Sequence, residues 1–164
     1  MVAKSFLDKG FKVLSIDNFS TGLRSNIPNG VDMIEGDVGD KNIIKELLNY
    51  EIDGIIHIAG QSSGQISFEN PIYDLKTNAL STLLLLKYAI TSGIKKFLYA
   101  SSMSVYGNMT HFPVREDSIT APESIYAVGK LASEQYLRIF SQKGICTTAL
   151  RLFNVYGPGK IFPI

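Results

Sequence analysis

Two side chains of the sequence, a phenol and an ammonium, have the spacing of a proton-transfer pair. Tyr126 and Lys130 lie four residues apart within a segment, Ser124–Gln142, that is predicted to be a helix, so both project from one face. A phenol with a reference pKa of about 10 is a poor base near neutral pH, but an adjacent ammonium favours the phenolate. The spacing alone does not decide the matter, because a solvated lysine beside a half-buried tyrosine has the same pattern.

A hydroxyl-rich turn precedes this pair by 24 residues. Ser102 follows an apolar segment, Lys96–Ala100, that is typical of a buried strand. A serine hydroxyl can orient a substrate hydroxyl by a hydrogen bond without adding another charge. Ser102, Tyr126 and Lys130 are therefore the candidate catalytic residues for moving a proton to and from a hydroxyl group.

The elements that must position these residues alternate along the chain. Predicted strands cover Phe11–Ile16, Val31–Ile34, Gly54–Ala59, Lys96–Ala100 and Ile145–Leu150, and predicted helices cover Ala3–Lys9, Asp40–Leu48, Pro71–Ser92 and Ser124–Gln142. Such alternation predicts an α/β fold, with a doubly wound parallel sheet covered by helices on both faces. The chain has 164 residues, 45% of them hydrophobic, which suits one domain and is too short for two.

Ligands of such sheets bind beyond the carboxyl ends of the strands. The residues predicted to lie there are Asp17, Asp37, Ala59, Gly60, Ser101, Ser102 and Asn154. Asp17 ends a strand where a dinucleotide-binding fold places the carboxylate that accepts hydrogen bonds from the adenosine ribose. This favours NAD over NADP, because a 2′-phosphate would meet a like charge, although Arg24 downstream could offset that charge. An aspartate before Asn18 is also an ordinary turn residue.

Charge and composition argue against several classes of function. Sixteen basic and fifteen acidic residues give a net charge of +1, without the basic cluster that a nucleic-acid surface needs. The longest apolar run, inside Ala79–Ile90, is too short to span a bilayer, and the N-terminus lacks a signal-peptide pattern. The single cysteine, Cys146, can form no internal disulfide. We therefore expect a cytoplasmic protein without a nucleic-acid or membrane partner, and with Cys146 in the strand core.

Neither histidine is favoured as a catalytic group. His57 lies inside an apolar strand, which predicts a structural role. His111 precedes Pro113 in a loop and has no partner in its own segment, so we expect it on the surface. No spacing of histidine and cysteine resembles a zinc site, and we predict no metal.

Two segments together resemble a known family. The sequence SSMSVYG at 101–107, after a strand, followed by YAVGK at 126–130, resembles the extended short-chain dehydrogenase/reductase family, in its NAD-dependent epimerase/dehydratase branch. The resemblance covers essentially the whole chain and implies a Rossmann-type fold, NAD as cofactor and a nucleotide sugar, such as a UDP-sugar, as substrate. It implies that Tyr126 is the catalytic base and acid, that Lys130 lowers the pKa of Tyr126 and holds the nicotinamide ribose, and that Ser102 orients the substrate hydroxyl.

The same resemblance implies further contacts. Asp17 and Asn18 would meet the adenosine ribose, the pair Asp37-Val38 would contact adenine, and the pair Ala59-Gly60 would pack against the cofactor. The segment at 150–159 resembles the one that leads into the family's substrate domain, which makes Asn154 a candidate contact for the pyrophosphate of the sugar nucleotide. Asn78 resembles an asparagine that bonds backbone near the active site and is read as structural. The family also implies a homodimer for the full-length protein.

The chain departs from the family pattern at both ends. The family opens with a strand and a Gly-rich turn at a helix N-terminus that binds the cofactor pyrophosphate, and it closes with a smaller domain that holds the sugar nucleotide. We identify neither part in the sequence, and the pattern predicts that the chain begins within a helix that Gly10 closes. We therefore expect residues 1–164 to be a partial NAD-binding domain, with a sheet split where the first strand belongs and with impaired activity.

Several functions remain open within this resemblance. The leading interpretation is 4-epimerisation of a nucleotide-linked hexose by transient oxidation at C4. The related 4,6-dehydratases carry an Asp-Glu pair where this chain has Met103 and Ser104, and related decarboxylases commonly carry a glutamate at the position of Ser104. A simple reductase is a further alternative. The absent pyrophosphate turn favours a different class, a non-catalytic nucleotide-binding or dimerising protein, whereas the intact catalytic set argues against it.

Overall fold

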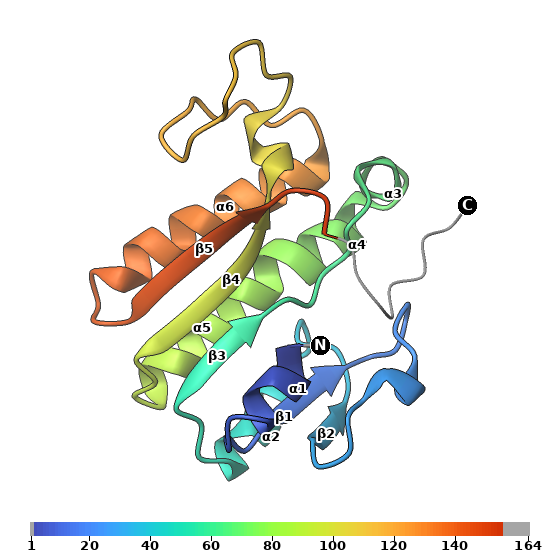
Figure 1. Ribbon diagram of the computed structural model, residues 1–164, viewed down its shortest axis with the longest axis vertical. Coiled ribbons are helices and arrows are strands. Elements are labelled where there is room, and N and C mark those ends of the chain that lie inside the picture. Colours follow the sequence, from blue (N-terminus) through green and yellow to red (C-terminus); the bar gives the residue numbers. More distant parts are fainter. Residues whose placement is uncertain (1, 156–164) are drawn as a thin grey trace.

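The computed structural model describes residues 2–155 and contains two parallel sheets (Figure 1). The first sheet pairs β1 (Leu14–Asp17) with β2 (Asp32–Glu35), and the second has the order β3 (Gly54–His57), β4 (Lys96–Ser102) and β5 (Cys146–Leu152). All three strand pairs are parallel, with Gly54 opposite Lys96 and Lys96 opposite Cys146 in the larger sheet. The prediction of a parallel α/β fold is confirmed.

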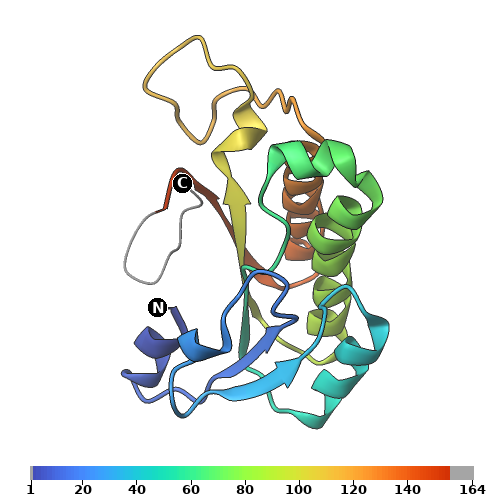
Figure 2. The ribbon, with the colours of Figure 1, turned by 90° about the vertical axis from the view of Figure 1, so that its right-hand side faces the viewer.

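Helices lie on both sides of these sheets. They are α1 (Val2–Leu7), α2 (Lys41–Glu46), α3 (Gly64–Glu69), α4 (Pro71–Leu75), α5 (Ser81–Thr91) and α6 (Ile125–Ser141), with 3-10 turns at Arg24–Asn26, Leu47–Asn49 and Met103–Tyr106. The helix predicted over Pro71–Ser92 is α4 and α5 joined by a π-helical turn, Lys76–Leu80. Figure 2 places α4, α5 and α6 on one side of the larger sheet and α1 on the opposite side of the molecule.

Side-chain caps explain where several helices begin. Asp40, before α2, accepts the backbone N–H of Asn42 at 2.8 Å, and Ser124, before α6, accepts that of Ala127 at 3.1 Å. Each cap satisfies a backbone donor that the first helical turn leaves without a partner. Ser63 does the same for α3, a short helix that the sequence reasoning did not predict. The cap on α6 fixes the start of the helix that carries the tyrosine and lysine pair.

The hydrophobic core fills the space between the larger sheet and helices α5 and α6. Its buried members are Ile34, Val38, Leu47, Leu85, Leu86, Tyr88, Ala89, Ile94, Phe97, Tyr99, Leu137 and Ile145. The cluster also contains side chains from the region of β2 and α2, so packing continues from one sheet to the other. Burial of this apolar area, rather than helix propensity, is what holds α5 and α6 against the strands.

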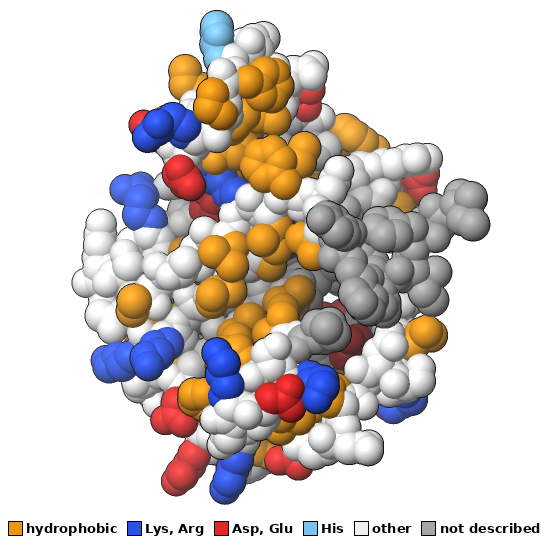
Figure 3. All heavy atoms as spheres, in the orientation of Figure 1, with side chains coloured by type: hydrophobic (Ala, Val, Ile, Leu, Met, Phe, Trp, Pro, Cys, Tyr) orange, Lys and Arg blue, Asp and Glu red, His pale blue; other side chains and the backbone are white. Residues whose placement is uncertain are grey.

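The opposite face of the larger sheet is apolar and open within residues 2–155. Ile56, Ile58, Leu150 and Leu152 are all exposed, and Figure 3 shows hydrophobic side chains gathered over this region. No described strand bridges β1 and β3, which agrees with the expected split of the sheet. Cys146 was expected in the strand core, and this is wrong: it is exposed, because it begins β5 on the face without helices.

We predict that truncating a core side chain between the larger sheet and the helices costs far more than truncating an exposed one. Leu86 has no exposed surface, whereas Leu48 is 65% exposed. Leu86→Ala is therefore expected to lower the free energy of unfolding by about 2 to 5 kcal/mol, and Leu48→Ala by roughly 0.5 kcal/mol or less. Urea unfolding followed by circular dichroism measures both changes. Equal losses would contradict the position assigned to the core.

Candidate active site

A cleft of about 300 Å³ opens at the carboxyl ends of β3, β4 and β5. Its lining residues are Ile58, Gly60, Gln61, Ser62, Ala100, Ser101, Ser102, Tyr126, Lys130, Leu152, Phe153, Asn154 and Val155. The cleft thus brings together the three candidate catalytic residues with two of the expected ligand contacts, Gly60 and Asn154. Parallel strands present their carboxyl ends at one edge, which is why residues so distant in sequence meet here.

Lys130 is a buried cation in the wall of this cleft. Its side chain lies beneath the surface with 4% exposure, and Nζ donates a hydrogen bond to the Ala100 carbonyl oxygen at 3.0 Å. Nζ also lies 4.9 Å from the ring centroid of Tyr99 and 5.6 Å from that of Tyr126. Loss of water on burial lowers the pKa of Lys130 to about 8, and the negative charge of Asp74 opposes this shift.

Tyr126 and Ser102 face each other across the same cleft. Burial raises the pKa of the Tyr126 phenol, a hydrogen bond to Ser102 lowers it, and the charge of Asp74 raises it further. Ser102 Oγ accepts hydrogen bonds from the backbone N–H of Ser104 at 3.2 Å and from the Ser104 hydroxyl at 3.0 Å, which fixes its position. A phenol, a serine hydroxyl and an ammonium held in this way can exchange a proton with a bound hydroxyl group.

A second group of expected site residues lies at the carboxyl ends of β1 and β2. Asp17 Oδ1 accepts the backbone N–H of Phe19 at 2.8 Å, so one carboxylate oxygen already serves the turn. Asn18 Nδ2 donates to Asp37 Oδ2 at 3.1 Å, and Asp37 Oδ1 accepts the backbone N–H of Gly39 at 2.7 Å. Asp17, Asn18 and Asp37 are therefore neighbours, as expected for one subsite. Their contact with a cofactor stays a prediction.

The other residues near the expected cofactor site already have partners within the chain. Val38 belongs to the buried core and Ala59 packs against it, so their side chains are already occupied. Arg24 forms an ion pair with Glu35, and its guanidinium carbon lies 4.3 Å from the centroid of the Phe19 ring. The positive charge of Arg24 is therefore already balanced, which weakens the case for a 2′-phosphate at this end.

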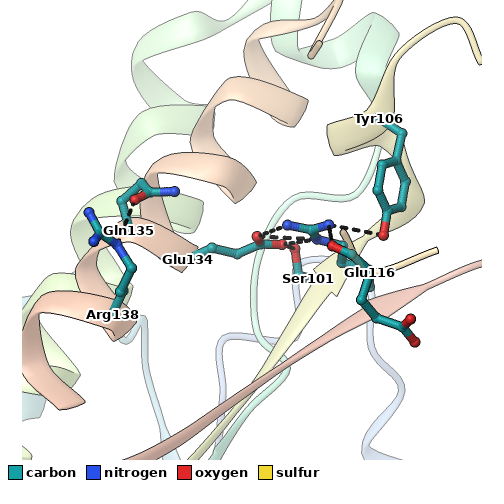
Figure 4. Close-up of polar contacts among 7 residues, drawn as sticks. Ser101, Tyr106, Glu116, Glu134, Gln135 and Arg138 are labelled. Carbon is teal, nitrogen blue, oxygen red and sulfur yellow. Dashed lines mark hydrogen bonds and ion pairs between the residues drawn. The ribbon is translucent and has the colours of Figure 1, made fainter. Parts of the chain in front are cut away.

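An ion-pair network that the sequence reasoning missed lies around Glu134, next to Ser101 of the cleft lining (Figure 4). The Arg151 guanidinium, from β5, donates to Glu134 of α6 at 2.8 Å, to the Tyr106 hydroxyl at 2.9 Å and to the Glu116 carbonyl oxygen at 3.0 Å. The Ser101 hydroxyl also donates to Glu134. Glu134 and Tyr106 raise the pKa of Arg151, so it stays charged. Strand β5, α6 and the loop after β4 are thereby tied together beside the cleft.

Neither histidine enters the cleft. His57 is 3% exposed, and its Nε2 lies 3.1 Å from Thr82 Oγ1 and 3.3 Å from Ser81 Oγ. Burial, with the nearby charge of Lys130, lowers the pKa of His57 to about 3, so it is neutral at ordinary pH and its structural interpretation is confirmed. His111 is exposed.

Two features are absent from residues 2–155. No three acidic, histidine or cysteine side chains gather there as they do around a metal ion. No helix in the same range has the length and apolarity that crossing a membrane requires.

Comparison with known proteins places the chain in a family. The model of the NAD dependent epimerase/dehydratase family matches residues 1–163. The chain belongs to this family. A UDP-glucose 4-epimerase from Azospirillum brasilense is 33% identical over 158 residues, which cover 95% of this chain and 45% of that protein. Membership confirms the resemblance drawn from the segments at 101–107 and 126–130.

Solved structures of family members have the same fold. UDP-glucose 4-epimerase of Thermotoga maritima, solved with UDP-glucose, matches with a TM-score of 0.92 and 33% identity, over 96% of this chain and 52% of that one. The Thermus thermophilus enzyme, solved with NAD, matches with a TM-score of 0.92 and 32% identity, over 98% of this chain and 53% of that one. The Rossmann-type fold is thus confirmed, and the chain spans about half the length of these epimerases.

Burial of Lys130 predicts a dependence of stability on pH. The folded chain holds the pKa of Lys130 at about 8, below its ordinary value of 10.5, so between these pH values the unfolded chain binds more protons. Stability from this group therefore rises with pH across that window. Relative to Lys130→Met, which lacks the titration, the wild type should gain stability between about pH 7.5 and about pH 10. Urea unfolding at both pH values measures the gain, with Lys95→Met as an exposed control. A constant difference would refute the burial argument.

Proposed function

We propose that residues 1–164 form a partial NAD-binding domain of a nucleotide-sugar epimerase that inverts C4 of a UDP-hexose. The observation that carries this proposal is the meeting of Ser102, Tyr126 and Lys130 in one cleft at the carboxyl ends of β3 to β5. The relatives named above, which are UDP-glucose 4-epimerases, support the choice of reaction and substrate. Because the chain spans about half their length, the activity belongs to a protein that also supplies the other half.

The residues present fit NAD as the cofactor. The Lys130 ammonium has three donors, and one of them is taken by the Ala100 carbonyl, which leaves donors for a ribose. Gly60 contributes a wall without a side chain, and a Cβ there would clash with Asn78 Oδ1. Asp17 keeps its second carboxylate oxygen for the adenosine ribose, with Asn18 and Asp37 beside it. When bound, NAD supplies a reversible hydride acceptor, so the overall reaction has no net redox change.

The chain's own side chains perform the proton transfer. Ser102 orients the 4-hydroxyl of the sugar toward the phenolic oxygen of Tyr126, which removes the hydroxyl proton. The Lys130 ammonium favours the phenolate that this step requires, because it lies beside the ring in a site of low polarity. After the sugar presents its other face, Tyr126 returns the proton to the same oxygen. Asn154 would meet the pyrophosphate of the sugar nucleotide.

The alternatives are less well supported. A 4,6-dehydratase needs an acid and a base after the catalytic serine, but Met103 occupies the first position and Ser104 is hydrogen bonded to Ser102. A reductase would use the same three residues, and only its products distinguish it. A non-catalytic role, as a nucleotide-binding or dimerising protein, is compatible with the split sheet. Impaired activity of residues 1–164 alone stays a prediction. A cytoplasmic location rests on the single cysteine and on the choice of cofactor.

A homodimer is proposed for the complete protein. Helices α3, α4 and α6 carry exposed apolar side chains, namely Phe68, Ile72, Leu75 and Val128. Apolar surface of this kind is what a second copy would cover. None of these four side chains lines the cleft, so the proposal leaves the assignments of the catalytic residues unchanged.

Removal of the Tyr126 hydroxyl tests the reaction. In a polypeptide that adds to this chain both the pyrophosphate-binding turn and the sugar-binding domain, Tyr126→Phe should lower turnover of UDP-glucose by about 100-fold or more, because the proton-transfer group is lost. NAD affinity should stay near that of the parent, since the ring and Lys130 are retained. Epimerase assays and calorimetric NAD titration measure the two properties, with Tyr73→Phe as the matched control. Turnover like the parent's would remove the central assignment.

Replacement of Asp17 tests the choice of cofactor. Asp17→Ala removes a ribose acceptor and an anion that repels a 2′-phosphate, so it should weaken NAD far more than NADP. Titration of the same polypeptide with each dinucleotide gives the two ratios. Because Asp17 also accepts the Phe19 backbone N–H, Asp17→Asn serves as a control that can keep this turn bond. Equal weakening of both dinucleotides would show that Asp17 is only a turn residue.

A further inference from the structure

A buried carboxylate outside the assigned catalytic set lies behind the cleft. Asp74, in α4, has no exposed surface. Its Oδ1 accepts hydrogen bonds from Gln61 Nε2 at 2.8 Å and from Asn78 Nδ2 at 3.0 Å. Its Oδ2 is buried without a hydrogen-bond partner among the described residues. A carboxylate is costly to bury in this way unless hydrogen-bond donors and a nearby positive charge compensate it.

The first neighbour is the loop that follows β3. Gln61 lines the cleft directly after Gly60, and its side chain donates to the Ser63 carbonyl oxygen at 2.7 Å as well as to Asp74. Asn78 Nδ2 also donates to the Gln61 carbonyl oxygen at 3.1 Å, the backbone bond expected of this asparagine. Asp74 therefore accepts from both side chains that fix this loop, and the loop forms one wall of the cleft.

The second neighbour is α6, which carries Tyr126 and Lys130. Asn78 lies in the π-helical turn after α4, and its carbonyl oxygen accepts the hydroxyl of Ser133 of α6 at 3.2 Å. A Cβ added to Gly129 would lie 3.4 Å from Asp74 Oδ2. The unpartnered oxygen thus faces α6 at the residue before Lys130, where no side chain intervenes. π-helical turns of this kind occur frequently at functional sites.

The titratable groups that face Asp74 belong to α6. The titratable groups that act on it or feel its charge are Lys130 and Tyr126 of α6, while Gln61 and Asn78 are neutral donors. Burial raises the pKa of Asp74, and its two hydrogen bonds and Lys130 lower it. The carboxylate in turn raises the pKa values of Lys130 and Tyr126. Asp74 therefore contacts the loop that forms one wall of the cleft, and its charge also raises the pKa values of Tyr126 and Lys130.

We infer that Asp74 is a positioning residue that holds the Gln61 loop against α6 and supplies the negative charge that keeps Lys130 an ammonium. Its consequence for catalysis rests on the proposed epimerase function. The role itself does not, because both the loop and the charge are properties of the chain without cofactor or sugar. Asp74 acts through Gln61 and Lys130, and it contacts no reacting atom in this arrangement.

The charge is tested by titration of the 164-residue chain itself. In Asp74→Asn, which preserves size and polarity, the pKa of Lys130 should fall below its value of about 8. The pKa of Tyr126 should also fall, because a nearby negative charge is removed. NMR of chains with ¹³C-labelled lysine and tyrosine follows both groups, assigned with Lys130→Met and Tyr126→Phe. Asp53→Asn, at an exposed aspartate, is the control and should shift neither.

A second variant separates the hydrogen bond between Gln61 and Asp74 from the charge of Asp74. Gln61→Met removes the donor to Asp74 but keeps the carboxylate, so amide hydrogen exchange at residues 60–63 should accelerate while Lys130 titrates near its wild-type value. Asp74→Asn should shift Lys130 instead. Unchanged titration of Lys130 and Tyr126 in folded Asp74→Asn would overturn the inference, as would unchanged exchange in Gln61→Met.

A wild-type measurement keeps the inference testable if Asp74→Asn does not fold. At neutral pH the ¹³Cγ chemical shift of Asp74 should be that of a carboxylate. It should then change as Lys130 loses its proton near its pKa of about 8. A protonated Asp74 at neutral pH would overturn the inference. None of these readouts uses NAD or sugar, so a failure of the epimerase proposal would leave them standing, and their failure would leave the assignment of Tyr126 unaffected.

Discussion

The site depends on the burial of one ammonium group. Lys130 can lie in the wall of the cleft because the Ala100 carbonyl accepts one of its hydrogen bonds and the Tyr99 ring lies beneath its charge. Both partners belong to β4, while Lys130 belongs to α6, so the contact fixes how the helix docks on the strand. That docking places Tyr126 opposite Ser102. A shift in the position of Lys130 would therefore move Tyr126 relative to Ser102.

Local patterns drew attention to the candidate catalytic residues, and the family resemblance assigned their roles. The four-residue spacing of Tyr126 and Lys130 is a property of the helix itself, and Ser102 follows from the end of an apolar strand. Caps such as Asp40 and the closing turn at Gly10, with φ of +83°, are equally local. These features depend on neighbours within one turn or one strand, which is why the sequence revealed them.

The supporting contacts could not be predicted in the same way. Arg151 and Glu134 are joined only by the docking of β5 on α6, and neither lies in a motif that the chemistry demanded. The spacing of Asp74 and Asn78 on one helix face was visible, but its meaning depended on Gln61, which reaches them from another strand end. Cys146 was misplaced because an apolar strand pattern does not say which face of the sheet receives helices. Tertiary packing decides each of these cases.

The separation of the two sheets has a consequence for how the site is held together. The candidate ribose carboxylate, Asp17, follows the smaller sheet, whereas Lys130 packs on the larger one, and no backbone ladder joins the sheets within residues 2–155. Their spacing is therefore governed by side chains such as Ile34, Val38 and Leu47, which interlock with the core. Such side-chain contacts resist a small tilt of one sheet against the other much less than a continuous ladder of backbone hydrogen bonds does. A dinucleotide that contacts the carboxyl ends of both sheets would fix the distance between them and so order the two sheets as it binds.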